Sequence, residues 1–385
     1  MDFTSRGYIR PKVKKDLDDS TMDTIRHICP GIRLTGPNPA ATADNGFVHD
    51  IFGPVRTLYR GWSTDDELRF HAAAGGVMSG LGCYLLETGK VDAIVHVRAN
   101  AEKPMETDAL ASRTVEDVKS GVQSRYGPAA PLVHVMRLLD QGIRFAVTGK
   151  PCDISAIRNL AEVDPRVDRQ VPYLISNFCG GVVSVRTSEL IAGYHGVAKE
   201  NVKLFRWRGD GWPGPTRVVA DNGEVYDLTY EETYYDDRVP WTYDINFRCK
   251  LCVDAVGEQA DISCPDAWIM VDGKPVHEEA PGANLLIART KAGEDLVAEA
   301  SAAGAIHLDP FSVEQLEAQH ADQYSRKLEN PGRLRGMEQE GEPTPDFDGY
   351  RADRMIELAG PERDRAAEEG ARQRIRVGAN LEPIA

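Results

Sequence analysis

Apolar runs bounded by turn residues alternate with amphipathic stretches through most of the chain between residues 64 and 330. Short runs rich in Val and Ile are typical of buried strands, whereas longer stretches with apolar residues three and four positions apart indicate helices. The pattern predicts strands at 91–97, 143–148, 171–176 and 284–289, and helices at 64–87, 115–122, 131–139, 187–194, 293–303 and 312–330, with a further helix starting near 153. Strands that alternate with helices predict an α/β fold, with a mixed or parallel sheet core flanked by helices.

Three segments depart from this pattern. Residues 1–60 have little periodicity and many turn residues, so we expect an irregular N-terminal arm. Residues 201–240 carry strand-like runs at 202–207, 216–220 and 225–229 with a hairpin turn at 221–223, and they predict a β-rich insertion. Residues 331–385 are charged, with few large apolar side chains, and predict a solvated tail that is helical from 361 onward. The catalytic domain is therefore expected at 61–330.

Charge and hydropathy narrow the classes of function. The 385-residue chain has a formal net charge of -15, which argues against nucleic-acid binding because that function needs a basic face. The longest weakly polar run, at 73–86, is shorter than the roughly 20 residues of a membrane span. The first residues carry no apolar export signal, so we expect a cytoplasmic location. There, the seven cysteines are expected to be free thiols and metal ligands.

Four cysteines are placed to bind one metal centre. Cys249 and Cys252 are two residues apart and can reach a shared centre from one tight turn. Cys152 and Cys179 each follow a predicted strand, and the carboxyl ends of parallel neighbours meet at one sheet edge, about 4.8 Å apart. Four thiolates bind a 4Fe-4S cluster, which is the main hypothesis, and they also suit an all-thiolate zinc site. In the simplest alternative, Cys152 and Cys179 are buried small residues.

The remaining cysteines have different patterns. Cys264 follows Cys252 by twelve residues and is a fifth candidate, an alternative to any of the four ligands. Cys83 lies in a predicted apolar helix and is expected in the core. Cys29 precedes a Pro-Gly pair and is expected to be a buried small residue and not a ligand.

Signals for an organic cofactor are weaker. The chain has neither G-x-G-x-x-G nor G-x-x-x-x-G-K-S/T, and no Ser-His-Asp or His-Glu-x-x-His pattern supports a hydrolase. Gly75 and Gly76, beside a predicted helix, let a ligand approach the backbone closely. A turn suited to a phosphate or a flavin carries hydrogen-bond donors and an aromatic ring, on Lys119, Ser124, Arg125 and Tyr126. Taken singly, each of these residues is more often a surface or packing residue.

Several motifs occur in an order that is typical of one family. They lie at 74–77, 84–92, 124–126, 149–154, 178–181 and 249–263. From about residue 53 to 328 the chain resembles the coenzyme F420 hydrogenase/dehydrogenase beta subunit family, a group of iron-sulfur flavoproteins that includes 7-hydroxymethyl chlorophyll a reductase-like proteins. The resemblance implies FAD, held by the segments around Gly75 and Ser124 and including Val77. It also implies a 4Fe-4S cluster on Cys152, Cys179, Cys249 and Cys252.

The chain departs from the family pattern at two positions. Ala74 stands where a serine is usual, which alters a flavin hydrogen bond, and Cys264 stands where a glycine is usual, which leaves the ligand set open. Many relatives begin with a ferredoxin-like segment bearing Cys-x-x-Cys-x-x-Cys, and this sequence starts after the corresponding point. We therefore expect one cluster per chain, with electrons delivered by a ferredoxin or a partner subunit in a homo- or hetero-oligomer.

These observations lead to three hypotheses. The first is an FAD-dependent iron-sulfur oxidoreductase that reduces an unidentified small organic molecule, with flavin chemistry linking two-electron and one-electron steps. Lys150, beside Cys152, is expected either to raise the potential of the cluster or flavin, or to be a solvent-facing turn residue. The second is a deazaflavin-oxidising electron-transfer subunit of a larger complex. The third, from another class, is a non-catalytic, zinc-stabilised interaction protein.

Overall fold

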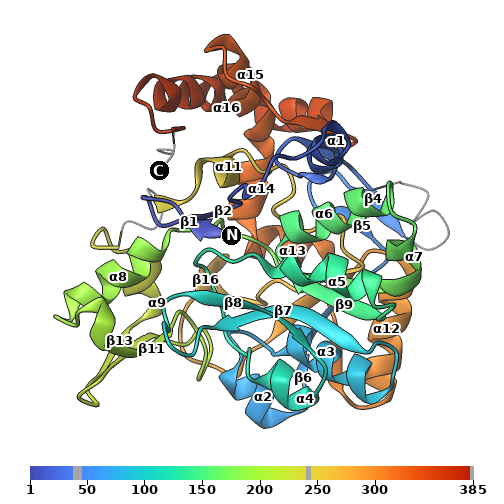
Figure 1. The fold of residues 1–385 in the computed structure, drawn as a ribbon, viewed down its shortest axis with the longest axis vertical. Coiled ribbons are helices and arrows are strands. Elements are labelled where there is room, and N and C mark those ends of the chain that lie inside the picture. Colours follow the sequence, from blue (N-terminus) through green and yellow to red (C-terminus); the bar gives the residue numbers. More distant parts are fainter. Residues whose placement is uncertain (38–45, 240–243, 382–385) are drawn as a thin grey trace.

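The structure is a computed structural model that describes residues 1–37, 46–239 and 244–381 (Figure 1). Parts of the predicted arm and tail, at 38–45 and 382–385, and the last residue of the predicted insertion, at 240, lie outside the described residues. Among the described residues, no helix combines the length and the apolar character needed to cross a bilayer.

An eight-stranded sheet forms the centre of the fold, in the order β18-β6-β17-β14-β10-β9-β7-β8. The four strands from β14 to β7 pair in parallel, and the others pair antiparallel to their neighbours. The bounds are β6 (Thr57–Ser63), β7 (Ala93–Ala99), β8 (Thr107–Ser112), β9 (Phe145–Gly149), β10 (Tyr173–Ser176), β14 (Ile262–Ser263), β17 (Asn284–Ala288) and β18 (Ile306–Pro310). The mixed α/β fold class predicted from the sequence is confirmed.

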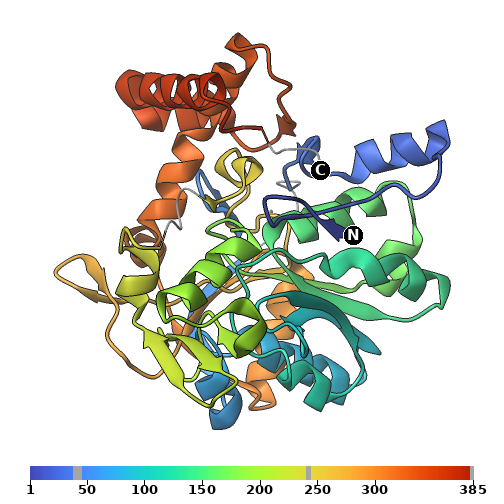
Figure 2. The ribbon, with the colours of Figure 1, turned by 60° about the vertical axis from the view of Figure 1, so that its left-hand side comes forward.

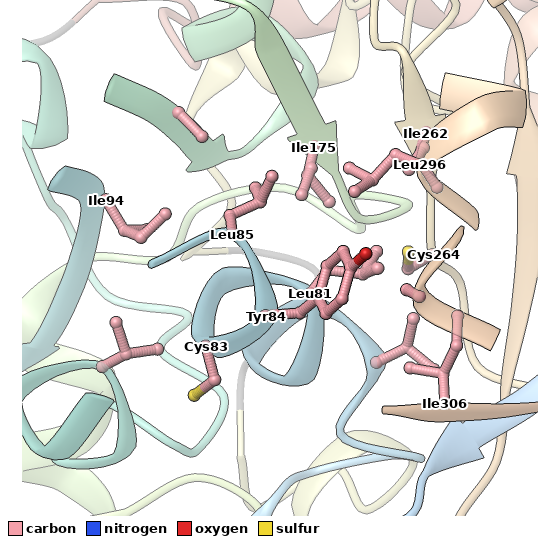
Figure 3. Packing of buried hydrophobic residues seen from close by; sticks show 14 of the residues in the cluster. Leu81, Cys83, Tyr84, Leu85, Ile94, Ile175, Ile262, Cys264, Leu296 and Ile306 are labelled. Carbon is pink, nitrogen blue, oxygen red and sulfur yellow. The ribbon is translucent and has the colours of Figure 1, made fainter. Parts of the chain in front are cut away.

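Helices cover both faces of this sheet. They are α2 (Asp66–His71), α3 (Val77–Glu87), α4 (Val115–Lys119), α5 (Val135–Asp140), α6 (Pro151–Ala161), α7 (Arg166–Gln170), α12 (Lys291–Ala302), α13 (Val313–Gln319) and α14 (Ala321–Leu328). Helices α3 and α12 pack on one face, where Leu81 and Leu296 meet Ile94, Ile175 and Ile262 (Figure 3). Helices α5, α6 and α7 pack on the other. Successive strand residues alternate between these two cores because side chains of a strand point to opposite faces.

Two predicted helices are each divided in the structure. The helix expected at 64–87 is α2 followed by α3, because the backbone is extended at Ala72 and left-handed at Gly76, the N-cap of α3 at φ 73°. The helix expected at 312–330 is α13 followed by α14, with His320 in a non-helical conformation at the junction. Four strands of the sheet, β6, β8, β14 and β18, had no prediction. The limit placed at residue 60 falls inside β6.

The predicted insertion contains a three-stranded antiparallel sheet of β11 (Val202–Arg206), β12 (Thr216–Ala220) and β13 (Val225–Leu228). It packs with α8 (Val185–Tyr194) and α9 (Tyr230–Tyr234) around a core that includes Trp207. The N-terminal segment contains β1 (Asp2–Phe3), β2 (Ile9–Arg10), α1 (Asp19–Ile28), β3 (Arg33–Thr35), β4 (Phe47–His49) and β5 (Gly53–Val55).

The C-terminal segment forms α15 (Asn330–Gln339), β19 (Asp346–Asp348) and α16 (Ala352–Arg376). Helix α16 begins before the predicted residue 361 and is interrupted at Gly360, whose φ is 70°. Figures 1 and 2 show α15 and α16 side by side as a layer beyond the sheet, with α14 leading up to them. The short helix α11 (Phe247–Lys250) lies below this layer, so the layer is positioned against the Cys249 to Cys252 turn (Figure 2).

Candidate functional site

Cys152 and Cys179 follow two adjacent parallel strands, as the sequence predicts. Strand β9 ends at Gly149, which lies opposite Ser176, the last residue of β10. Cys152 lies in the first turn of α6, and Cys179 follows β10 in a loop fixed by a 2.9 Å hydrogen bond from its backbone N–H. Helix α6 begins at Pro151 and not near 153, since proline suits the first helical position and Lys150 forms the cap with Asp153.

Cys249 and Cys252 lie in and after the short helix α11. The Asn246 side chain accepts the backbone N–H of Arg248 at 3.0 Å and so caps this helix at its start. The backbone N–H of Cys252 donates to the Cys249 carbonyl oxygen at 3.4 Å. These contacts hold the two cysteines in one tight turn, as the two-residue spacing predicts.

A single arginine joins the two cysteine segments. The Arg326 guanidinium, on α14, donates to the Cys179 carbonyl oxygen at 3.2 Å and to the Gly180 carbonyl oxygen at 2.9 Å. Its other nitrogen donates to the Cys249 carbonyl oxygen at 2.7 Å. One rigid fork therefore fixes the loop after β10 relative to the α11 turn.

Two more side chains from the same helical region bind this turn. Asn330 donates to the Leu251 carbonyl oxygen at 2.6 Å, and Arg333 donates to the Lys250 carbonyl oxygen at 2.8 Å. With Arg326, these residues lie four and seven positions apart, which is the spacing of one helical face. Sequence reasoning missed all three, and their shared spacing is the signal that could have found them.

A buried ion pair anchors this helical face. Lys327, next to Arg326, is fully buried and pairs with Glu258, whose carboxylate also accepts from Arg351 at 2.7 and 2.9 Å. Removing one partner of such a pair leaves a buried charge without compensation, so the contact fixes the position of α14. Arg326 consequently reaches the cysteine segments from a rigid support.

The four thiols influence one another electrostatically. Burial, then Asp254 and the thiols of Cys179 and Cys249, raise the pKa of Cys252 to about 12, against the effect of Arg326. Burial and then Cys179 raise the pKa of Cys249. The Cys152 residue keeps exposed surface. Burial of its thiol group, and then the Asp153 carboxylate, nevertheless raise the pKa of that thiol. The raised pKa values of Cys152, Cys249 and Cys252 favour a cationic centre that displaces their protons, and a set of four thiol donors fits an iron-sulfur cluster.

Within the described ranges, no three Cys, His, Asp or Glu side chains gather closely enough to hold a single metal ion. The zinc-stabilised alternative stays a hypothesis. The assignment of a cluster to Cys152, Cys179, Cys249 and Cys252 likewise stays a prediction, supported by the arrangement of their four segments.

Lys150 is the N-cap residue of α6, two residues before Cys152, and it is not a free turn residue. Its ammonium group is 2.6 Å from the Asp153 carboxylate. Burial lowers the pKa of Lys150, but Asp153, Cys152 and Cys179 outweigh it and raise that pKa above its usual value. The lysine therefore places a positive charge beside two candidate cluster ligands.

The two predicted flavin segments meet at Arg208, on the loop after β11. Its guanidinium donates to the Ala73 carbonyl oxygen at 2.6 Å and to the Tyr126 hydroxyl at 3.2 Å. The same group pairs with Asp266 at 2.8 Å and lies over the Tyr230 and Trp268 rings, at 5.3 and 5.5 Å from their centroids. An aromatic neighbourhood of this kind suits a planar ligand. No sequence pattern pointed to Arg208.

Several residues predicted to contact the flavin have protein partners in the structure. Lys119 pairs with Asp65 at 2.6 Å. Arg125 donates hydrogen bonds of 2.8–3.0 Å to three backbone carbonyl oxygens, those of Pro104, Glu106 and Phe205. A side chain on Gly75 would lie 2.8 Å from backbone atoms of β6 and β17. The contacts of these residues with a flavin stay predictions, as do those of Gly76, Val77, Ser124 and Tyr126.

The other three cysteines lie elsewhere. Cys83 and Cys264 belong to the apolar core between the sheet and α3 (Figure 3). Burial alone raises the pKa of Cys264, with no charged group contributing. Cys29 is half-buried, and its sulfur is 3.9 Å from the Arg248 guanidinium, close to the α11 turn.

The chain combines a mixed α/β sheet with two strand-end cysteines and a cysteine turn that Arg326 holds beside one of them. Comparison with known proteins identifies the family. The model of the coenzyme F420 hydrogenase/dehydrogenase beta subunit N-terminus matches residues 58–137, and the model of its C-terminus matches residues 142–314. The chain belongs to this family, and the resemblance inferred from its motifs is confirmed.

Three relatives illustrate the range of the family. A coenzyme F420-dependent sulfite reductase of Methanocaldococcus jannaschii is 26% identical over 66% of this chain, which spans only 38% of that protein. A coenzyme F420 hydrogenase subunit beta of Methanothermobacter thermautotrophicus is 23% identical over 72% of this chain and 95% of the relative. A chain of the F420-reducing [NiFe] hydrogenase complex from Methanosarcina barkeri shares the fold, with a TM-score of 0.59, 21% identity, and coverage of 77% of this chain and 97% of that one. Oxidoreductase and electron-transfer proteins are therefore its relatives.

Proposed function

We propose that this chain is an electron-transfer subunit that exchanges electrons with the deazaflavin coenzyme F420 inside a larger oxidoreductase complex. One observation carries the proposal: Arg326 joins the Cys179 loop to the Cys249 turn. The thiols of Cys179 and Cys252 are close enough to Cys152 to raise its pKa. Relatives named as F420 hydrogenase and F420-dependent formate dehydrogenase beta subunits support the choice of coenzyme.

Two cofactors are part of the proposal. A 4Fe-4S cluster on the four cysteines supplies one-electron steps, and FAD near the Gly75 and Ser124 segments links them to hydride transfer. Arg208 holds those two segments together through Ala73 and Tyr126. Lys150 and Arg326 place positive charge beside the thiols and so favour the more negative, reduced state of a cluster.

The hypothesis of a reductase for a small organic substrate has less support, because the named relatives act on or with coenzyme F420. The two hypotheses differ in the molecule that exchanges electrons with the flavin. Both differ from the zinc hypothesis in requiring iron.

The test begins with anaerobic purification and quantitation of iron, zinc and flavin. We expect about four irons and one FAD per chain, and reduction of both groups by reduced F420 faster than by NADH or by reduced ferredoxin alone. Iron and flavin with reduction only by ferredoxin would favour the organic-substrate reductase. A colourless protein with one zinc per chain would refute both redox hypotheses.

A further inference from the structure

A groove of about 420 Å³ lies directly beside the α11 turn. The loop between β1 and β2, the start of α8 and the C-terminal residues around Leu381 form its walls, while residues from Asp244 to Arg248 and Leu251 lie along it. Figure 1 shows β1, β2 and α11 next to one another. Because Arg248 precedes Cys249 and Leu251 precedes Cys252, the groove adjoins the turn that carries two of the four candidate ligands.

The groove has a positive surface in a strongly acidic protein. Arg6, Arg186 and Arg248 line it and are exposed, and none of the three forms an ion pair with a carboxylate among the described residues. Arg10 also lines it, with its guanidinium 5.5 Å from the Tyr8 ring. Lone arginines are common on protein surfaces, but here arginines from three separate segments border one groove in a chain of net charge -15.

Two acidic side chains, Asp244 and Glu342, also line the groove, and Asp244 is already engaged with α8. Asp244 accepts hydrogen bonds of 2.8 Å from the Ser184 backbone N–H and hydroxyl, and it also accepts from the Thr187 hydroxyl. These bonds fix the start of α8 relative to the segment leading into α11. They also leave the exposed arginine charges without a neutralising partner from this carboxylate.

The spread of the arginines indicates the kind of ligand. A small anion would meet one or two guanidinium groups, whereas carboxylates distributed on a protein surface can meet arginines from the β1–β2 loop, α8 and α11 together. The rest of this chain is acidic and repels an acidic partner protein. Electrostatic attraction is therefore confined to the groove, and it directs the partner to this site. Guanidinium groups also pair with carboxylates in a bidentate geometry.

We propose that this groove is the docking site of a small acidic electron-carrier protein, which would exchange electrons through the Cys249 to Cys252 turn. The inference rests on the proposed function, because it assumes a redox centre at that turn. It adds the surface, the charge of the partner and the arginines that recognise it.

The experiment measures binding and electron exchange with a purified acidic bacterial ferredoxin as the probe. The test variant is Arg6→Glu with Arg186→Glu, and the milder Arg6→Gln with Arg186→Gln guards against a folding defect. The matched control is Arg113→Glu, an exposed arginine after β8 without an ion pair among the described residues. Binding is followed by calorimetry and electron exchange by stopped-flow absorption.

We expect the charge-reversed variant to lose at least tenfold in affinity and association rate at low salt, the glutamine variant to lose less, and the control to change less than twofold. The difference should shrink as salt rises toward 0.5 M, since the Debye length falls to a few ångströms. Equal losses in the control, no loss in either test variant, or no binding by the wild-type protein would each overturn the inference. Displacement of the ferredoxin by inorganic phosphate at constant ionic strength would identify a small-anion site and overturn it too.

The two proposals fail separately. Calorimetric binding does not depend on iron or flavin, so a protein lacking both groups refutes the proposed function whatever the binding result. Normal iron, normal flavin and reduction by F420, combined with unchanged ferredoxin binding in the charge-reversed variant, would refute the docking site alone.

Discussion

Arg326 is the side chain whose removal should most directly open the cysteine site. It donates hydrogen bonds of 3.2, 2.9 and 2.7 Å to carbonyl oxygens in the loop after β10 and in the α11 turn. The change Arg326→Met keeps much of the length of the side chain but removes all three bonds and the charge. The change Arg326→Lys keeps the charge but loses the planar fork, so it can satisfy fewer of the carbonyl groups.

The free energy that Arg326→Met should remove follows from the three hydrogen bonds of Arg326. Each contributes about 1 kcal/mol when water can replace it, so the three together contribute about 3 kcal/mol to holding the two segments. A tenfold change corresponds to about 1.4 kcal/mol, so Arg326→Met should open the site roughly 100-fold more often. Arg326→Lys should fall between the wild type and Arg326→Met.

The assay follows the bleaching of cluster absorption by an iron chelator under anaerobic conditions. Arg335 provides the control, because it pairs with Asp364 and Glu368 on α16 and makes no hydrogen bond to the cysteine segments. We expect Arg335→Met to leave the bleaching rate unchanged, although it removes a charge from the next helix. Bleaching of Arg326→Met at the wild-type rate, or equal acceleration in both variants, would refute the role given to Arg326.

Three further predictions concern the ligand set, pH and packing. Cys152→Ser should lose its iron and Cys264→Ser should keep it, by iron quantitation, and the opposite pattern would show the ligand assignment to be wrong. Burial lowers the pKa of His96 to about 4, so the unfolded chain binds a proton below its ordinary 6.5 while the folded chain does not. The wild type should therefore lose about 2 kcal/mol more than His96→Gln between pH 7.5 and pH 5 in urea unfolding, and parallel curves would contradict this. Gly75→Ala, whose Cβ would lie 2.8 Å from two backbone atoms, should cost about 1–3 kcal/mol, whereas Gly193→Ala meets no atom within 4 Å and should cost nothing; equal midpoints would refute the packing argument.

Local sequence patterns predict the longer buried strands well, because a run of Val and Ile bounded by turns has few other stable environments, but they miss the two-residue strand β14. Strands β7, β9, β10 and β17 and the three strands of the insertion all lie at predicted positions. Strands β6 and β18 were missed, since their partly exposed positions carry arginine, tryptophan and histidine side chains that break the alternation. Their pairing with each other joins residues far apart in the chain, which local patterns do not register.

The candidate site shows the same division between local and distant information. The placement of Cys152 and Cys179 after parallel strands follows from the order of elements, and the structure brings their segments together as expected. The contacts of Arg125 were not foreseeable, because a guanidinium suited to a phosphate is equally suited to three carbonyl oxygens. Which of these it meets depends on the β8 and β11 segments that surround it.

The family match ends before the residues that bind the backbone of the cysteine turn. The matched region ends at residue 314 and contains all four candidate ligands. Arg326, Asn330 and Arg333, which bind the backbone around three of those ligands, lie beyond it. A four-residue helix such as α11 has too few internal hydrogen bonds to fix its own position, so its geometry depends on donors supplied from outside. The four candidate ligands thus lie inside the matched region, whereas the side chains that hold their turn lie beyond it, on α14 and α15. Substitutions there should alter the retention of a cluster without touching any cysteine.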